Sequence, residues 1–272
     1  DLDLFVLNLG DRRARCLTEG FAPAVGSQVI GAAPGRRNVW WSPADGRIRF
    51  VATDGSALKL YETDAAGSAF RDAALPDTGL GSPDFAANGS GLAYLGSSFG
   101  AFPALRFCDL ASGQTRTLWA PGEEVYRRAD LVKPERADFT NARGVVNEGW
   151  LFLPPGLDAS GKCPLIVAFY GGISPYGQAF RPEFFWLAGR GYAVYLVNPE
   201  GAVGYGPAYA DAHVNEWGET AGRDILEGVD KILAARPYLD GSRVGCYGGS
   251  YGGFMTLWLV GHSERFAAAV DY

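Results

Sequence analysis

The sequence is poor in the residues that most often shuttle protons or bind metals. Its 272 residues hold only two histidines, His213 and His262, and four cysteines at positions 16, 108, 163 and 246. The cysteines lie far apart and show no metal-type pairing, which argues against a zinc site. Such isolated cysteines are typical of core thiols in a reducing compartment, so we expect a cytoplasmic protein.

Long apolar runs and clustered positive charge are also absent. No run approaches the about 18 residues that a membrane span needs, and the longest, 164–170 and 192–197, have the length of buried strands. The net charge is −6 and the basic residues are scattered, which argues against nucleic acid and anionic membranes as partners. The glycine-rich string GAVGYG lacks the order of a dinucleotide fingerprint, and no Walker sequence occurs. We expect no cofactor and no metal.

The first half of the chain, up to about residue 138, reads as β structure. Short alternating stretches are broken by Gly, Pro, Asn and Asp. WSPADGRIRFVATD at Trp41 recurs 44 residues later as FAANGSGLAYLGSS at Phe85, and each is followed by a second unit, at Leu58 and at Leu105. A period of roughly 40–50 residues with several strands predicts β-propeller blades, with a β-sandwich as the alternative.

These blades are too few to close a propeller. Propellers generally need about 4–8 blades, whereas residues 1–138 have room for about two and a half. The chain opens directly on an alternating strand pattern, without an initiator Met or a signal peptide. We therefore expect a partial propeller that begins in mid-blade.

From about residue 139 strands and helices alternate. CPLIVAFYGG is a continuous apolar run that ends in glycines, which is typical of a parallel strand covered on both faces. The pattern predicts helices over 182–190, 219–235 and 252–261, and strands over 192–197 and 243–247. This half is therefore expected to be α/β with a parallel sheet. The last residues, RFAAAVDY, read as the next strand, so we expect the sheet to continue beyond the chain.

A nucleophile elbow is predicted between the strand at 243–247 and the following helix. Gly248-Gly249-Ser250-Tyr251-Gly252 fits the pattern Gly-x-Ser-x-Gly in the strand–turn–helix context that this elbow requires. A second match, centred on Ser98, follows a blade strand and precedes Ala-Phe-Pro instead of a helix. The context selects Ser250 as the nucleophile and leaves Ser98 as a chance match.

The strings GGSYGGFMT, NPEGAVGYG and FYGG resemble the prolyl-oligopeptidase family of serine peptidases, closest to its acylaminoacyl-peptidase and dipeptidyl-peptidase branches. The resemblance covers residues 1–272 and implies a β-propeller, here partial (1–138), followed by an α/β-hydrolase domain, here 139–272. It also implies that Ser250 is acylated, that the Tyr251 backbone N–H is one oxyanion donor and that the Tyr170 hydroxyl is another.

Two departures from the family pattern accompany this resemblance. Tyr170-Gly-Gly-Ile173 stands where many relatives have His-Gly-Gly-Pro, and Glu200 stands where the loop usually has Arg. The second departure removes a positive charge from that loop.

The partners of Ser250 are expected beyond residue 272, because in this fold the acid and the histidine follow the serine. His213 precedes Ser250, and we interpret it as a surface or structural histidine. His262 lies 12 residues past Ser250 on the same helix, about 18 Å along the axis at 1.5 Å per residue. Asp271 can only neighbour the site from the end of the last strand. Asp224 reads as a helix-surface carboxylate paired with Arg223.

The sequence thus favours a serine peptidase for acylaminoacyl-, aminoacyl- or dipeptidyl-type substrates, inactive as this piece alone. Two alternatives stay open, a non-catalytic interaction scaffold and a carboxylesterase. The blades favour a peptidase over an esterase, since a plain esterase needs no propeller. The expected partners are short peptides and the remainder of the same polypeptide, and self-association is left open.

Overall fold

The computed structural model describes residues 2–31, 38–124 and 131–272, and the chain forms two compact units. The first comprises Asp1–Val125, Gly177–Phe180 and Val203–Pro207. The second comprises Tyr126–Tyr176, Arg181–Ala202 and Ala208–Tyr272. Two short segments of the second half of the sequence therefore belong to the first unit.

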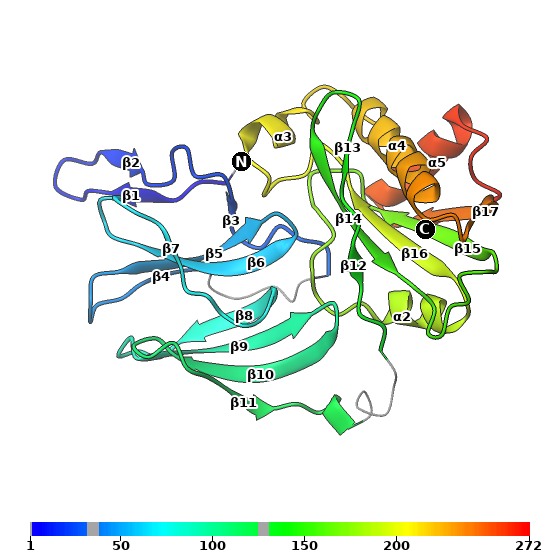
Figure 1. The fold of residues 1–272 in the computed structure, drawn as a ribbon. Helices are drawn as coiled ribbons and strands as arrows, with labels where there is room; N and C mark the ends of the chain where they lie inside the picture. The colour runs from blue at the N-terminus through cyan, green and yellow to red at the C-terminus, as the bar shows by residue number, and fades with distance from the viewer. Residues whose placement is uncertain (1, 32–37, 125–130) are drawn as a thin grey trace. The chain divides into compact units, whose positions relative to one another are not determined.

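The first unit is made of antiparallel sheets (Figure 1). A two-stranded sheet pairs β1 (Phe5–Leu7) with β2 (Ala14–Cys16). A five-stranded sheet has the order β3-β5-β6-β7 with β4 also on β5, and a four-stranded sheet has the order β11-β10-β9-β8. Their bounds are β3 (Ala24–Val25), β4 (Val39–Trp41), β5 (Ile48–Asp54), β6 (Ala57–Thr63), β7 (Arg71–Asp72), β8 (Gly79–Phe85), β9 (Gly91–Ser98), β10 (Ala101–Asp109) and β11 (Thr115–Trp119).

The sequence repeat corresponds to equivalent places in the two larger sheets. Trp41 pairs with Ile48 across β4 and β5, and Phe85 pairs with Leu92 across β8 and β9. Ile48 and Leu92 are at most 2% exposed. The repeated residues therefore fix the same strand register and the same inward face twice, as the period predicts.

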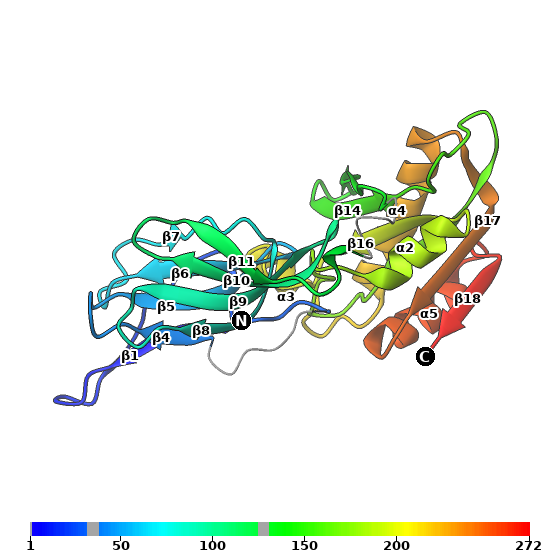
Figure 2. The ribbon, with the colours of Figure 1, turned by 90° about the horizontal axis from the view of Figure 1, so that it is seen from below.

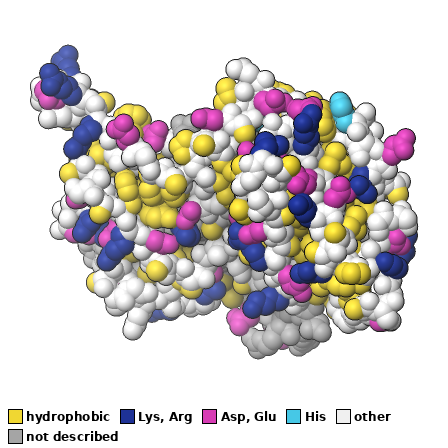
Figure 3. All heavy atoms as spheres, turned by 45° about the horizontal axis from the view of Figure 1, so that its top comes forward, with side chains coloured by type: hydrophobic (Ala, Val, Ile, Leu, Met, Phe, Trp, Pro, Cys, Tyr) yellow, Lys and Arg dark blue, Asp and Glu magenta, His cyan; other side chains and the backbone are white. Residues whose placement is uncertain are grey.

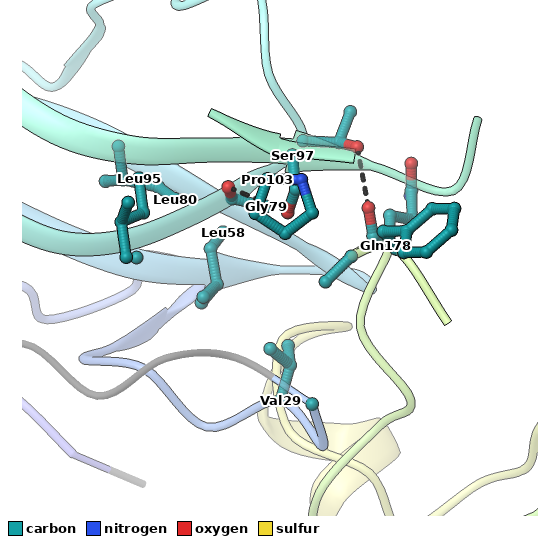
Figure 4. Close-up of a pocket in the computed structure, with 13 residues that line it drawn as sticks. Val29, Leu58, Gly79, Leu80, Leu95, Ser97, Pro103 and Gln178 are labelled. Atoms are coloured by element: carbon teal, nitrogen blue, oxygen red, sulfur yellow. Dashed lines mark hydrogen bonds between the residues drawn. The ribbon is translucent and has the colours of Figure 1, made fainter. Parts of the chain in front are cut away.

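The segment Gly177–Phe180 is bonded into the first unit through the β5–β6 turn and β8. The Gln178 side chain donates to Ser56 Oγ over 2.9 Å, and the Gln178 backbone carbonyl accepts from Thr78 Oγ1 over 3.1 Å. A small cavity of about 80 Å³ lies beside this segment. Its wall includes Val29, Leu58 and Pro103, which are labelled together with Gln178 in Figure 4. These bonds explain why the segment belongs to this unit.

The second unit is built on a seven-stranded sheet of order β12-β14-β16-β15-β17-β18, with β13 paired to β14. The pairs β15–β16, β15–β17 and β17–β18 are parallel. Figure 1 shows α4 and α5 side by side, and Figure 2 shows β18 beside β17 at the sheet edge. The bounds are β12 (Glu135–Arg136), β13 (Phe139–Thr140), β14 (Val146–Phe152), β15 (Cys163–Phe169), β16 (Ala193–Asn198), β17 (Leu239–Gly248), β18 (Ala268–Asp271), α2 (Pro182–Gly189), α3 (Pro207–Asp211), α4 (Glu219–Ala235) and α5 (Tyr251–His262).

The expected alternation of strands and helices is therefore present. Helix α4 has the predicted bounds because its apolar residues follow the helical period, and Ile225, Val229 and Ile232 are buried in the core of this unit. Strand β17 begins four residues before the predicted strand, and the short α3 was not predicted.

Two further observations concern the charged surface and the length of the helices. Acidic and basic side chains are interspersed over the face seen in Figure 3. Among the helices of the described ranges, none combines the length and the apolar character needed to cross a bilayer.

Candidate active site

Ser250 lies at a sharp turn between β17 and α5. Its backbone has φ 57° and ψ −118°, an unusual conformation for a residue with a side chain. Conformations of this kind cost of order 1–3 kcal/mol and persist where the surroundings enforce them. The side chain is exposed at the carboxyl edge of the sheet, where sites form in α/β proteins.

The glycines around Ser250 are required by close packing. A Cβ on Gly248 would meet the backbone of Gly252, and one on Gly253 would meet Asp271 Oδ1. A Cβ on Gly252 would lie 2.9 Å from the carbonyl oxygen of Phe169, the last residue of β15. Helix α5 therefore begins directly against the end of the neighbouring strand, which only glycine at position 252 allows without a shift.

Two backbone amides next to the Ser250 side chain have different roles. The Ser250 N–H donates to the Tyr272 carbonyl over 2.9 Å. Tyr251 is the first residue of α5, and N–H groups in a first turn have no acceptor within their own helix. The helix dipole adds positive potential there, so the Tyr251 N–H is suited to a developing negative charge.

Tyr170 follows β15 and lies beside the elbow. Its ring centroid is 5.9 Å from that of Tyr251, and the residue is half-buried. Gly171 has φ 74°, and a Cβ there would come within 3.0 Å of Met255 in α5. Burial and the neighbouring Tyr170 raise the pKa of Tyr251. The structure therefore brings Ser250, Tyr251 and Tyr170 together.

His213 lies closer to this place than its position in the chain indicated. Its ring centroid is 5.3 Å from Tyr251 and 6.0 Å from Trp217, and the residue is half-buried. Burial lowers the pKa of His213, which favours the neutral form of the imidazole. Chain order gave no signal for this contact, because it depends on how the loop around α3 folds back toward α5.

His262 and Asp271 were also considered as partners of Ser250. The first lies at the far end of α5 and the second at the end of the last strand. His262 ends α5, stacks on Trp258 at 4.1 Å and has its Nδ1 2.8 Å from the Trp258 carbonyl. Asp271 ends β18, where it pairs with Gly248. Its carboxylate therefore neighbours the first turn of α5, as the sequence predicted for the end of that strand.

The interpretation of Asp224 as a surface carboxylate was wrong. Asp224 is 0% exposed, and its carboxylate accepts from Arg143 over 2.5 Å and from Asn141 over 3.0 Å. Arg223 pairs instead with Glu219, one turn earlier in α4. Burial raises the pKa of Asp224.

Glu200 belongs to the same buried network. Its carboxylate accepts from Arg143 over 2.6 Å and from Asn141 over 2.7 Å, and its N–H donates to Asp224 over 3.1 Å. Arg143, in the β13–β14 connection, is the cation that pairs with both carboxylates. Within the described ranges, no three potential metal ligands lie close enough to form a metal site.

Comparison with known proteins places this geometry in context. Residues 178–272 match the model of the prolyl oligopeptidase family. The chain is 36% identical over 158 residues to the uncharacterized peptidase YuxL of Bacillus subtilis and 31% identical over 166 residues to dipeptidyl-peptidase 5 of Porphyromonas gingivalis. These matches cover 58% and 59% of the chain, which spans 24% of the length of each relative.

Solved structures match nearly the whole chain. An acylaminoacyl peptidase of Pyrococcus horikoshii superposes with a TM-score of 0.82 at 23% identity, covering 99% of this chain and 40% of that one. Dipeptidyl peptidase 4 of Porphyromonas gingivalis gives a TM-score of 0.80 at 19% identity, covering 99% and 37%. At these identities the likeness shows a shared fold, across both units.

Proposed function

The chain belongs to the prolyl oligopeptidase family of peptidases, and from this premise we propose that its full-length gene product hydrolyses short peptides through an acyl-enzyme on Ser250. The substrates are acylaminoacyl-, aminoacyl- or dipeptidyl-type peptides, the classes that the names of the similar proteins indicate. The single observation that carries the proposal is the strained Ser250 backbone in its glycine-packed turn.

The chemistry follows the general course of acyl transfer. The Ser250 hydroxyl attacks the peptide carbonyl while a histidine takes its proton, and the leaving amine then receives that proton. The Tyr251 N–H and the Tyr170 hydroxyl donate to the oxyanion. Water then hydrolyses the ester on Ser250 by the same steps.

We assign the acid and the histidine to polypeptide that follows residue 272. Within the described ranges, neither His213 nor His262 forms a hydrogen bond to Ser250, and the similar proteins are far longer than this chain. An apolar groove of about 310 Å³ between α2 and the edge of the sheet leaves Trp186 and Val270 more than half exposed. We expect the polypeptide that follows residue 272 to cover this groove.

We assign the two larger sheets of the first unit to blades of a β-propeller. Their repeated register supports this, as does the likeness of the whole chain to longer peptidases.

Covalent labelling tests the assignment of Ser250. A fluorophosphonate probe applied to the full-length gene product should label Ser250, located by peptide mapping, and Ser250→Ala should abolish the label. Ser98→Ala is the matched control and should be labelled normally. Labelling at Ser98, or at neither serine in a preparation that hydrolyses peptides, would overturn the assignment. A gene product that carries neither label nor activity would favour the interaction scaffold.

Substitution tests the role of Tyr170. Tyr170→Phe should lower kcat by roughly 10²–10³, as for the loss of one oxyanion donor, with little change in KM because ground-state binding is retained. Tyr192→Phe removes an equivalent hydroxyl at an exposed place and should leave kcat unchanged. An unchanged kcat for Tyr170→Phe would assign Tyr170 to packing.

A further inference from the structure

We infer that Asn198 is a positioning residue for Tyr170, acting by holding the far end of the loop that Tyr170 begins. This inference rests on the proposed function, because it gives Asn198 a part in placing the proposed oxyanion donor. The loop runs from Tyr170 to Tyr176, and Asn198 is the last residue of the neighbouring strand β16.

The Asn198 side chain forms hydrogen bonds with both the backbone N–H and the backbone carbonyl of Tyr176. Its Oδ1 accepts from the Tyr176 N–H over 2.8 Å, and its Nδ2 donates to the Tyr176 carbonyl over 3.2 Å. Asn198 is 1% exposed and Tyr176 is 2% exposed, so water does not compete for these bonds. A planar amide that meets one residue through two bonds fixes both its distance and its orientation.

Asn198 is itself held in place. Its carbonyl accepts from the Tyr209 hydroxyl over 2.8 Å, and the oxygen of that hydroxyl lies 2.9 Å from Asn147 Oδ1. Two residues further on, Glu200 enters the buried network with Asp224 and Arg143. The Asn198 side chain that binds Tyr176 is thus connected to strand β16 and to helix α4.

The near end of the loop rests on α5. Gly171 packs on Met255, and a Cβ on Gly172 would lie 3.0 Å from the Tyr251 ring and 3.1 Å from the Tyr170 ring. The Tyr170 ring therefore packs beside Tyr251, while the far end of the loop that carries it is held by Asn198. A donor must be held within about 0.5 Å of its productive place to be effective, so releasing the far end should misplace the Tyr170 hydroxyl.

A double-mutant cycle on the full-length gene product tests the inference. Asn198→Ala should lower kcat by about 10–100-fold, the usual effect of a misplacement near 1 Å, with KM changed little. In the Tyr170→Phe background the same substitution should change kcat by less than about twofold, since the group that it positions is gone.

Thr18→Ala is the matched control. Thr18 is also a buried polar residue, 2% exposed, and its hydroxyl accepts from the Leu4 N–H and donates to the Asp3 carboxylate, all within the first unit. It should lower stability without a change in kcat. Should Asn198→Ala fail to fold, Asn198→Asp takes its place, because it keeps the acceptor for the Tyr176 N–H and turns an oxygen toward the Tyr176 carbonyl.

Different experimental results would overturn the positioning role of Asn198 and the proposed function. Multiplicative losses from Asn198→Ala and Tyr170→Phe, or a wild-type kcat for a folded Asn198 variant, would overturn the positioning role while Ser250 is still labelled. Absence of Ser250 labelling would overturn the proposed function itself.

Discussion

Side-chain volume at single positions decides whether the turn at Ser250 forms. Gly252→Ala places a methyl group 2.9 Å from the Phe169 carbonyl, so we expect a loss of about 1–3 kcal/mol and slower probe labelling. Gly261→Ala lies in the same helix, and its added Cβ meets nothing within 4 Å. It should stabilise the protein by about 0.5–1 kcal/mol. Equal urea midpoints for the two variants would contradict this packing argument.

The ionisation of His213, near the elbow, makes the stability of the fold depend on pH. Because burial lowers its pKa, the unfolded chain binds more protons near pH 6 than the folded protein does. The contribution of His213 to stability is therefore fully present above its unfolded pKa of about 6.5, and it is lost as the pH falls toward the lower folded pKa. His213→Phe keeps an aromatic ring beside Tyr251 and should reduce the loss of stability between pH 7.5 and pH 5 in urea titrations.

His262→Phe is the control for that experiment, since it removes an imidazole that stacks on Trp258 at the exposed end of α5. If His213→Phe retained the full pH dependence of the wild type, the titration would belong to another group.

At the scale of elements, the buried network joins α4, the loop after β16 and the β13–β14 connection. Arg143→Met leaves the carboxylates of Asp224 and Glu200 buried without their cation. Removing one partner of a buried pair costs about 3–5 kcal/mol, and the lower end applies here because the Arg143 side chain is 42% exposed.

Arg223→Met is the matched control for this prediction, because Arg223 is 68% exposed and pairs with Glu219 along the helix surface. It should change the free energy of unfolding by less than about 0.5 kcal/mol. Chemical denaturation at pH 7 measures both variants. A larger loss of stability for Arg223→Met than for Arg143→Met would instead support the surface pairing of Asp224 with Arg223 that the sequence predicted.

The same elements show how far the sequence can predict. The period of α4 follows from local spacing, and the elbow follows from glycine spacing between a strand and a helix. The partner of Asp224 lies 81 residues away, and the contact between His213 and Tyr251 depends on a loop that folds back. Such long-range contacts leave no local pattern. The role predicted for Tyr170 came from the resemblance of its loop to the family pattern, and the structure places this residue after a strand that pairs with β17.

At the scale of the whole molecule, the two units have separate hydrophobic cores. We expect calorimetry to resolve two transitions, since units with their own cores unfold independently unless strongly coupled. Leu60→Ala in the first unit and Leu165→Ala in the second remove the same side chain from sites at most 1% exposed. Each should destabilise its own transition by about 2–5 kcal/mol. A single transition shifted equally by both would show one cooperative unit.

Catalytic activity also depends on the whole molecule. The 272 residues alone should hydrolyse an aminoacyl or acyl-aminoacyl chromogenic amide with almost no turnover, since a triad without its base retains only about 10³–10⁴-fold over water. The full-length gene product should be active, as should the chain supplemented with the downstream segment. Full turnover by a homogeneous 272-residue chain, verified by intact mass, would reveal a base within this sequence.

The membership of Gly177–Phe180 and Val203–Pro207 in the first unit has a consequence for biosynthesis. A nascent chain emerges from the ribosome in order, and amino-terminal domains generally fold first. Here the β5–β6 turn must wait for Gln178 and Gly204, which bond to Ser56 and Gly55. At about 5–20 residues per second, the loops that complete the first unit emerge several seconds after its last strand. During that interval the cavity beside Leu58 and Pro103 lacks the part of its wall that Gln178, Ala179 and Phe180 supply.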